Sequence, residues 1–504
     1  MSATAPDLTR ERSREAPSWL PLAGLIVLAA LLRFSTLGVQ SLWFDEAATW
    51  ELTRLPLGDM LSALPHRESN PPLFYVLEWL TARAFGDGAL GLRGLSALAG
   101  TLLVPVAYGI GERVGGRRVA FAAAALVTVN PLLVWFSQEA RSYELVALLS
   151  GVALLLFLHA LDDDRPRLLA WWALAAALAL CSHYFACFVI APQLAWLLWR
   201  HPRRRAVIAA AGALALVALA LLPLLLAQRG NPYDIAGSAI ATRLLQVPKQ
   251  FLLGYRGPLA VASVVLGALL IAAALWLLRF AQRRTRERAL LVGGIGLVGL
   301  LLPLCGALAG ADYLNARNLL PALLPLATTL AAGFAARGPD GRLRGALGPA
   351  LLTVLCALST AIVIASAVDQ QYRRPDWKGL AKALGTTAGA RAIVISPANG
   401  EAALRYYRRG LERMGRDPVL VREVDVVSVA GSGGPGEKPE LPRLHLGRTE
   451  LALPGFGAPR REQTDSWVIL RYRVPRPLPA VPDPLGAVRF STLPPTVDVL
   501  PGGR

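Results

Sequence analysis

Charged residues are scarce in this chain. Asp, Glu, Lys and Arg make up 17% of its 504 residues, whereas hydrophobic residues make up 54%, and the mean hydropathy is +0.45. Ordinary soluble domains carry about 25% charged residues, so this deficit excludes that class. Apolar runs approaching the roughly 20 residues that cross a bilayer recur as far as about residue 370. The composition therefore predicts a polytopic α-helical membrane protein.

Cysteine is scarce as well, and the four Cys residues lie inside apolar runs, at 181, 187, 305 and 356. Their spacing indicates small core residues, with neither a disulfide framework nor a metal site. The formal net charge is +18 and comes almost entirely from Arg. In a soluble protein this excess would suggest nucleic acid. Here much of it lies in short loops between apolar runs, where it indicates topology, so we expect no nucleic-acid partner.

The apolar runs predict about eleven membrane spans. The first, about 20–38, lacks the small-residue cleavage site of a signal peptide and is therefore retained as a helix. The segment 72–85 is too short to cross comfortably and carries Glu78 and Arg83, so we expect it to lie along the interface. The other spans are predicted at about 92–111, 119–136, 143–161, 168–184, 186–199, 206–227, 259–278, 289–309, 318–336 and 346–368.

The distribution of Arg predicts the orientation. With the N-terminus inside, the Arg-rich loops fall on the cytoplasmic side, in agreement with the positive-inside rule. Counting 72–85 as a span would reverse every later loop and break this agreement. We therefore expect a multi-pass protein of the plasma (inner) membrane. Its outer face would carry the 39–91 loop, the 137–142 turn, the 228–258 loop, the 311–317 turn and the C-terminal tail.

The chain divides into three predicted parts: a disordered cytoplasmic tail at 1–18, a transmembrane catalytic domain at 19–368, and an extracytoplasmic α/β domain at 369–504. The last part changes character. Apolar runs predict strands at 391–396, 419–429 and 467–473, and a helix follows a Pro/Asn/Gly turn at 401–409. The segment 431–439 has the composition of a flexible linker, and we expect the Pro-rich end to be irregular.

Two adjacent carboxylates, Asp45 and Glu46, follow the first span and are flanked by Trp43, Phe44 and Trp50. Aromatic rings suit the headgroup zone, where they bury while their polar edges stay wet. A carboxylate pair at this depth could act on a lipid-linked substrate from the water side. The alternative is a solvated acidic loop beside an aromatic belt.

Three further outward segments carry polar groups: His66 to Tyr75, Ser137 to Glu144 and Asp312 to Asn318. Ionisable groups at membrane depth are costly and are therefore functional candidates. The Arg fork suits phosphate, which favours chemistry on a lipid-linked phosphate. The alternatives are a helix-end salt bridge for Glu139 and Arg141, and interface snorkelling for Arg317. Arg33, near the outer end of the first span, could serve either role.

These residues resemble a known family. Leu42-Trp43-Phe44-Asp45-Glu46-Ala47, Asn70-Pro71-Pro72-Leu73, Leu92-Arg93-Gly94-Leu95-Ser96 and Ser137-Gln138-Glu139-Ala140-Arg141-Ser142-Tyr143 occur in the order seen in family 39 glycosyltransferases. These belong to the GT-C superfamily, with protein O-mannosyltransferases and lipid A aminoarabinose transferases. The resemblance is strong over about 20–200 and looser to about 368, where Arg317-Asn318-Leu319-Leu320-Pro321 resembles a late element. It is weak in the tail.

The resemblance implies a GT-C transferase that moves a sugar from a polyprenyl-phosphate donor to a protein, lipid or glycan acceptor outside the membrane. Mannose is the sugar that the resemblance favours. The resemblance also makes Asp45 the catalytic carboxylate and Glu46 its usual neighbour. Relatives often carry Lys or His before the Pro-Pro pair. Here Asn70 stands there, which shifts donor-phosphate binding toward Arg141, Arg317 or His66. Glu139 and Tyr143 complete the expected substrate site. His183, before Tyr184, also resembles a recurrent feature, with a core or interface His as the alternative.

An inverting single displacement fits these expectations, with Asp45 as the general base for an acceptor hydroxyl and Arg stabilising the leaving phosphate. The second outer segment offers only Glu139 and no dense Asp cluster. We therefore expect no cofactor and no required metal, although a divalent ion could assist.

Three other functions remain open: a transporter or lipid flippase, a polysaccharide polymerase or ligase of similar fold, and a binding or sensing protein with an outer domain. Transporters place charges on broken helices near the midplane and often show inverted repeats. Here the charges cluster at one face and no such repeat is evident.

Overall fold

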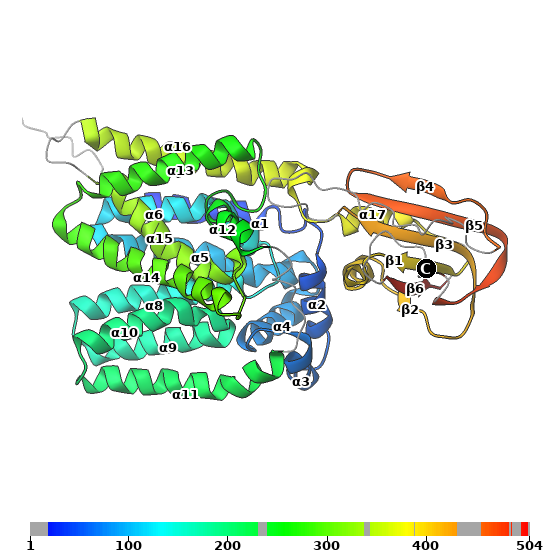
Figure 1. The fold of residues 1–504 in the computed structure, drawn as a ribbon, viewed down its shortest axis with the longest axis horizontal. Coiled ribbons are helices and arrows are strands. Elements are labelled where there is room, and N and C mark those ends of the chain that lie inside the picture. The colour runs from blue at the N-terminus through cyan, green and yellow to red at the C-terminus, as the bar shows by residue number, and fades with distance from the viewer. Residues whose placement is uncertain are drawn as a thin grey trace, which may run out of the picture.

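The computed structural model describes residues 19–229, 239–336, 343–387, 389–430, 455–482, 485 and 495–501. It has two parts, a bundle of helices and a sheet domain at one end of it (Figure 1). The tail expected to be disordered, 1–18, and the expected linker, 431–439, lie outside the described residues.

The bundle begins with α1, followed by three helices in the segment that connects α1 to α5. Its helices are α1 Leu20–Phe34, α2 Phe44–Thr53, α3 Leu57–Arg67, α4 Leu73–Phe85, α5 Ala89–Gly115, α6 Arg117–Val129, α7 Pro131–Ser137, α8 Tyr143–Asp162, α9 Pro166–Ser182, η1 Tyr184–Ala186, α10 Cys187–Arg200, α11 Arg205–Gln228, α12 Ile240–Leu253, α13 Ala260–Leu278, α14 Arg283–Leu308, η2 Ala316–Ala322, α15 Leu323–Phe334 and α16 Leu343–Val368.

Within the described residues, six helices are long and apolar enough to cross a membrane: α5, α8, α11, α13, α14 and α16. The pair α6 and α7, bent by 56° at the break before Pro131, would make a seventh. Three shorter apolar helices, at Leu20–Phe34, Pro166–Ser182 and Tyr184–Arg200, accompany them. The chain is thus a multi-pass α-helical membrane protein, but the predicted number of about eleven spans is not confirmed.

The predictions for two segments outside the expected spans, 72–85 and 228–258, have different outcomes. Helix α4 forms where a short interfacial helix was expected, and it exposes Leu80 and Phe85 while burying Glu78. The 228–258 segment was predicted as a loop, yet it contains α12. This helix was missed because Arg243, Lys249 and Pro248 interrupt its apolar run. The buried positions, Arg243, Val247, Gln250 and Leu253, lie three or four residues apart, so α12 has one buried face.

The sheet domain has six strands in the order β2-β6-β1-β3-β5-β4. Strand β1 is parallel to β3, and the other pairs are antiparallel. The strands are β1 Arg391–Ile395, β2 Glu412–Arg413, β3 Val419–Val429, β4 Arg460–Gln463, β5 Trp467–Ala480 and β6 Thr496–Leu500. The helices α17 Trp377–Leu384 and α18 Glu401–Tyr407 share an apolar core with the sheet, around Trp377, Ile393 and Leu404.

The expected α/β character of this domain is confirmed, and its three predicted strands and one predicted helix all form. The end was expected to be irregular, which is wrong in two places. Strand β5 continues to Ala480 through Pro475, Pro477 and Pro479, and β6 forms beyond it. Because these prolines occupy alternate positions, their missing N–H groups all face one edge, which a strand tolerates.

Candidate active site

Helix α2 presents the predicted carboxylate pair in its first turn. Trp43 is the N-cap, and its backbone N–H donates to Glu46 Oε2 at 3.4 Å, a contact that favours helix initiation. Asp45 is 5% exposed and Glu46 is fully buried. The alternative of a solvated acidic loop is therefore wrong. Acidic groups here are also favoured by the helix dipole.

Glu46 is held by four donors from distant parts of the chain. Its Oε1 accepts from Arg93 Nε at 2.7 Å and from the Ala140 N–H at 3.0 Å. Its Oε2 accepts from Arg93 Nη2 at 2.7 Å and from Arg374 Nη1 at 3.1 Å. Arg93 belongs to α5 and also donates to three backbone carbonyls of the 37–41 segment. Glu46 is therefore an anchor for the start of α2 rather than a mobile acid or base.

Asp45, by contrast, makes one ion pair, with Arg317 Nη1 at 3.0 Å from Oδ2. Arg317 lies at the start of η2, where the Asn315 side chain accepts from its N–H at 3.2 Å. The preceding turn is held by α12, because Arg243 donates to Asp312 Oδ1 at 2.6 Å. The Arg317 side chain keeps 15% of its surface exposed. This pair is thus the point where the charge cluster reaches the molecular surface.

Arg141 is engaged by a different carboxylate. Its Nη1 and Nη2 donate to the two oxygens of Glu68 at 2.8 and 2.9 Å, a bidentate pair with both side chains buried. Nη1 also lies 3.3 Å from Thr49 Oγ1 and 3.4 Å from the Asp45 carbonyl oxygen. Arg141 therefore packs against α2, and its fork is directed at Glu68, the residue after the end of α3.

Glu139 pairs with a residue from outside the bundle. Arg374, between α16 and α17, donates to Glu139 Oε2 at 2.7 Å and to the carbonyl oxygens of Gln138 and Trp135. Glu139 Oε1 is buried without a hydrogen-bond partner in the described structure. Burial raises the pKa of Glu139 to about 7, although the attraction of Arg374 opposes the rise. The Arg374 guanidinium also lies 4.8 Å from the Trp135 ring, within cation–π range.

Tyr143 and His183 line the same region, with ring centroids 5.8 Å apart, and both are buried. His183 Nδ1 accepts from the Phe185 N–H at 3.2 Å. Because Nδ1 accepts this bond, the ring proton resides on Nε2 and is available to donate.

Two predicted residues are not joined to this cluster. His66 is exposed in the last turn of α3. Asn70 is buried, and its carbonyl oxygen accepts from Gln228 Nε2 at 3.2 Å. Neither side chain hydrogen-bonds to the charged residues above in the described part of the chain. Arg33, which was open between phosphate binding and snorkelling, does neither: it is fully buried and donates to the carbonyl oxygens of Val127 and Thr128.

Three members of the cluster were not predicted from the sequence. Glu68 lies in the polar segment from His66 to Tyr75, and Arg93 lies in the motif Leu92 to Ser96, but neither residue was predicted to be in the site. An Arg within an apolar run, such as Arg93, is costly unless paired, and this was a usable signal. Arg374 follows the last span in a short polar connector, and nothing in its sequence context points to the first outer loop.

The cluster is balanced in charge. Its carboxylates and guanidiniums pair across six segments of the chain, and all are buried or nearly so. Buried charges are tolerated when they are paired and hydrogen-bonded. Its members are Asp45, Glu46, Glu68, Glu139, Arg93, Arg141, Arg317 and Arg374. No group of three or more His, Cys, Asp and Glu side chains in the described residues could hold a metal ion, and metal independence stays a prediction.

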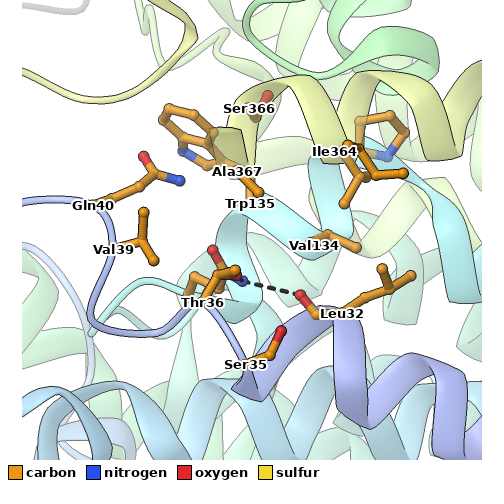
Figure 2. A pocket seen from close by; sticks show the side chains of 13 residues that line it. Leu32, Ser35, Thr36, Val39, Gln40, Val134, Trp135, Ile364, Ser366 and Ala367 are labelled. Atoms are coloured by element: carbon orange, nitrogen blue, oxygen red, sulfur yellow. Dashed lines mark hydrogen bonds between the residues drawn. The ribbon is translucent and has the colours of Figure 1, made fainter. Parts of the chain in front are cut away.

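Two cavities flank this region. The smaller, of about 190 Å³, lies between α1, α7 and α16 and is lined by Gln40, Trp135 and Ser366 among others (Figure 2). Gln40 and Trp135 also accept hydrogen bonds from Arg374, so this cavity adjoins the Arg374 side of the cluster. The larger, of about 430 Å³, is almost entirely apolar and lies among α12 to α16. It reaches Leu314 and Leu319, on either side of Arg317 in the sequence.

Comparison with known proteins agrees with this architecture. Residues 69–227 match the family described as dolichyl-phosphate-mannose-protein mannosyltransferase. No curated protein sequence matches the chain. Among solved structures, ArnT from Cupriavidus metallidurans bound to undecaprenyl phosphate is 12% identical, covers 90% of this chain and 98% of its own, and gives a TM-score of 0.56.

Two other structures are similar. The apo state of the same ArnT is 12% identical over 77% of this chain and 84% of its own, with a TM-score of 0.52. The arabinofuranosyltransferase AftD from Mycobacteria is 19% identical over 91% of this chain and 40% of its own, with a TM-score of 0.49. The two ArnT structures, with TM-scores above 0.5, show that this chain has the ArnT fold, which is the GT-C architecture implied by the sequence resemblance.

Proposed function

We propose that this protein is a glycosyltransferase that moves a sugar from a polyprenyl-phosphate donor to an acceptor hydroxyl outside the membrane. Mannose is the first candidate, in keeping with the family that residues 69–227 match. The observation that carries the proposal is the Asp45–Arg317 pair, a carboxylate and a guanidinium 3.0 Å apart at the exposed edge of an otherwise closed charge cluster. A base and a phosphate ligand are the two groups this transfer needs.

In this mechanism Asp45 accepts the proton of the acceptor hydroxyl as its oxygen attacks the anomeric carbon. The bond from that carbon to the phosphate oxygen breaks, and the polyprenyl phosphate leaves as an anion. Arg317 stabilises the charge that develops there. An arriving phosphate competes with Asp45 for the Arg317 fork, so donor binding would itself release the carboxylate for proton transfer. The configuration at the sugar inverts because one displacement occurs.

Arg317 is a better phosphate ligand than Arg141 on geometric grounds. The fork of Arg141 is directed at Glu68, and its side chain is 2% exposed. Using it on a phosphate would leave Glu68 buried without that partner, which is strongly unfavourable. We therefore propose that Arg317 contacts the phosphate, while the Arg141–Glu68 pair supports α2 through the contacts of Arg141 with Asp45 and Thr49. Tyr143 and the Nε2–H of His183 lie on the same side and are proposed to contact the donor.

The larger cavity suits the lipid part of such a donor. It is lined by Leu, Ile, Val and Phe side chains of six α-helices, α6 and α12 to α16, and lies beside the segment that carries Arg317. An isoprenoid chain in this cavity would place its phosphate near the Arg317 end. The ArnT structure with a similar fold contains undecaprenyl phosphate, which supports a lipid-phosphate donor here. The acceptor is proposed to be a protein, lipid or glycan.

We propose that the site and the C-terminal domain face the extracytoplasmic side of the plasma (inner) membrane, since the Arg-rich loops lie at the opposite ends of the spans. Reporter fusions after Arg204, Arg286 and Asp369 test this orientation. Alkaline phosphatase is expected to be active only after Asp369. Activity at either of the first two positions, or none at the third, contradicts it.

The function is tested with detergent-purified protein and radiolabelled polyprenyl-phosphate sugars, offered singly with a membrane extract as acceptor. Transfer of label from one donor is the expected result, and chelation with EDTA is expected to leave the rate unchanged. Movement of intact donor across liposomes without transfer would favour the flippase alternative. Release of a polymer without an exogenous acceptor would favour a polymerase.

A further inference from the structure

Helix α2 lies between the helical bundle and the sheet domain (Figure 1). Ala47, in its first turn, is fully buried and belongs to the apolar core of the sheet domain with Trp377 and Leu380. One turn later, Trp50 makes an edge-to-face contact with Tyr406 of α18, with ring centroids 5.3 Å apart. The helix that carries Asp45 therefore shares its apolar packing with a domain that follows the last span.

The segment that leads into α2 is fixed by the same domain. The Leu42 N–H donates to Tyr407 Oη at 2.8 Å. Ser41 Oγ donates to Asp376 Oδ1 at 3.2 Å and accepts from the Lys378 N–H at 3.0 Å. Ser41 and Leu42, the two residues before the N-cap Trp43, are thus hydrogen-bonded to residues of α17 and α18 and to the N-cap of α17. These bonds set where α2 begins.

Two arginines from the C-terminal part of the chain form ion pairs with residues of α2 itself. Arg405 of α18 lies 3.3 Å from Glu51 Oε1 in the second half of α2, pairs with Glu401, and lies 3.6 Å from Asp498 Oδ2 of the sheet. Arg374 binds Glu46 in the first turn of α2 and Glu139 of the bundle. One arginine therefore joins α2 to the sheet domain, and the other joins the start of α2 to the connector after α16.

We propose that the C-terminal sheet domain and the connector that leads into it together position the catalytic helix α2, and that Arg405 of the domain and Arg374 of the connector are the positioning residues. The effect of this positioning on turnover rests on the proposed function, whereas the docking of α2 does not. Asp45 precedes Glu46 in the same helical turn, so a displacement of Glu46 moves Asp45 with it. A misplacement of about 1 Å can lower a rate about 100-fold.

Arg374→Gln is the principal test, with steady-state kinetics on a polyprenyl-phosphate sugar. The expected result is a kcat lowered about 100-fold with the KM for the donor changed little, because Arg317 remains in place. Arg473→Gln is the matched control. Arg473 is an exposed arginine of the sheet domain that pairs with Glu423, away from α2, and its variant is expected to keep the wild-type kcat. Equal kcat in the Arg374 variant and wild type overturns the proposal.

A double variant separates positioning from stability. Removing Arg374 leaves Glu139 buried without its guanidinium, which lowers the melting temperature. Glu139→Gln combined with Arg374→Gln removes that buried charge and is expected to recover much of the melting temperature. The kcat is expected to stay low because Glu46 still lacks its bond to the connector. Recovery of kcat together with stability would show that Arg374 acts only by stabilising the fold, and would overturn the proposal.

Hydrogen exchange gives a readout that does not depend on activity. In both Arg374→Gln and Arg405→Gln, amides of 44–53 are expected to exchange faster than in wild type, while those of α5 and α8 are unchanged. Arg405 is partly exposed, so its variant is expected to fold and carries the test if Arg374→Gln does not. Its kcat is expected to fall about two- to five-fold.

Unchanged exchange in α2 and unchanged kcat in Arg405→Gln overturn the proposal even if the Arg374 variant is unfolded. Failure of the proposed function looks different: the wild-type protein itself would transfer no sugar, while the difference in exchange between wild type and the two variants would persist.

Discussion

Two buried charge clusters can be compared in this molecule, one around Asp45 and one on the sheet. The sheet cluster comprises Arg391, Glu423, Asp425 and Arg471. Its pairs are set by strand register, since Arg391 is opposite Glu423 and Asp425 is opposite Arg471. Distances are 2.5 Å for Arg391–Glu423 and 3.0 Å for Arg471–Asp425. Both arginines also donate to the Leu384 carbonyl oxygen at the end of α17.

The comparison shows how similar ion pairs serve different ends. In the sheet cluster each charge has partners on the neighbouring strand, and a helix C-terminus, which favours cations, covers it. In the cluster around Asp45 the pairs join residues that lie from 47 to 328 positions apart in the sequence, and the Asp45–Arg317 pair reaches the surface. A closed cluster can only stabilise, whereas an open pair can exchange one partner for a substrate. The predictions below test this distinction.

The largest effect is expected from Asp45→Asn. The change is nearly isosteric but removes the basic oxygen, so turnover should fall about 10²- to 10⁴-fold, while the melting temperature changes little because Asp45 has one ion-pair partner. Steady-state kinetics and thermal unfolding of the purified variant measure both. Near-normal turnover would show that Asp45 is not the base.

The matched change in the sheet is Asp425→Asn. It leaves Arg391 and Arg471 with fewer partners and is expected to destabilise the domain by about 3–5 kcal/mol, without a change of kcat in the folded fraction. Loss of kcat at unchanged stability would remove the distinction between the two clusters.

The next effect compares Arg317→Gln with Arg141→Gln. A charge-assisted contact contributes about 1.5–3 kcal/mol, so Arg317→Gln should lower kcat/KM about 10- to 150-fold with the fold intact. It should lower kcat as well, because the leaving phosphate gains charge in the transition state. Arg141→Gln should reduce turnover too, but together with the melting temperature, because Glu68 loses its bidentate partner. Kinetics on a short-chain donor analogue and thermal unfolding distinguish them.

Asn70→Ala belongs to the same series and is expected to matter much less than either arginine, because its side chain is uncharged and not bonded to the cluster. If Asn70→Ala is the most damaging of the three and both arginine variants stay active, the phosphate site lies elsewhere.

A substitution of Glu46 tests whether Glu46 has a different role from that of its neighbour Asp45. Glu46 accepts from Arg93, Arg374 and the Ala140 N–H, so Glu46→Gln places an amide NH₂ among donors. We expect a lower melting temperature and a smaller loss of kcat than in Asp45→Asn. A turnover loss as large as that of Asp45→Asn at full stability would give Glu46 a direct part in the chemistry.

The smallest effect concerns pH. Because burial raises the pKa of Glu139 from its ordinary value to about 7, the folded state binds its proton more tightly than the unfolded state does. This contribution to stability is present at low pH and is lost as pH rises through 7. Glu139→Gln removes it. Between pH 5 and pH 8, the melting temperature of wild type should therefore fall relative to that of Glu139→Gln, and parallel curves would contradict the assignment.

Much of the fold was predictable because it follows from local patterns. Apolar runs placed the helices, and alternating or continuous apolar stretches placed β1, β3 and β5. The helix α12 was missed because its apolar face is interrupted in sequence, and β6 because five residues after a Pro-rich stretch carry little signal. The predicted count of spans is not confirmed, because several helices in the described part of the bundle are shorter than the length that crosses a bilayer.

The site was predictable in part for the same reason. Asp45, Arg141 and Arg317 were found because each sits at a polar interruption beside a span. Their pairing was not predictable, since it depends on tertiary packing: Arg141 turns to Glu68, and Arg317 to Asp45. Arg374 could not be found, because its role arises only when the connector after α16 folds back on the first outer loop.

The position of Arg374 has a consequence for the order in which the protein is made. Chains emerge N-terminus first, and early parts begin to fold while later ones are still being synthesised. The segments carrying Asp45, Glu139 and Arg317 all insert before residue 374 leaves the ribosome. Until then neither Glu46 nor Glu139 can pair with Arg374, and the first turn of α2 lacks this contact. The nascent protein would thus occupy the membrane before the cluster around Asp45 is complete, and synthesis of the connector after α16 would complete it.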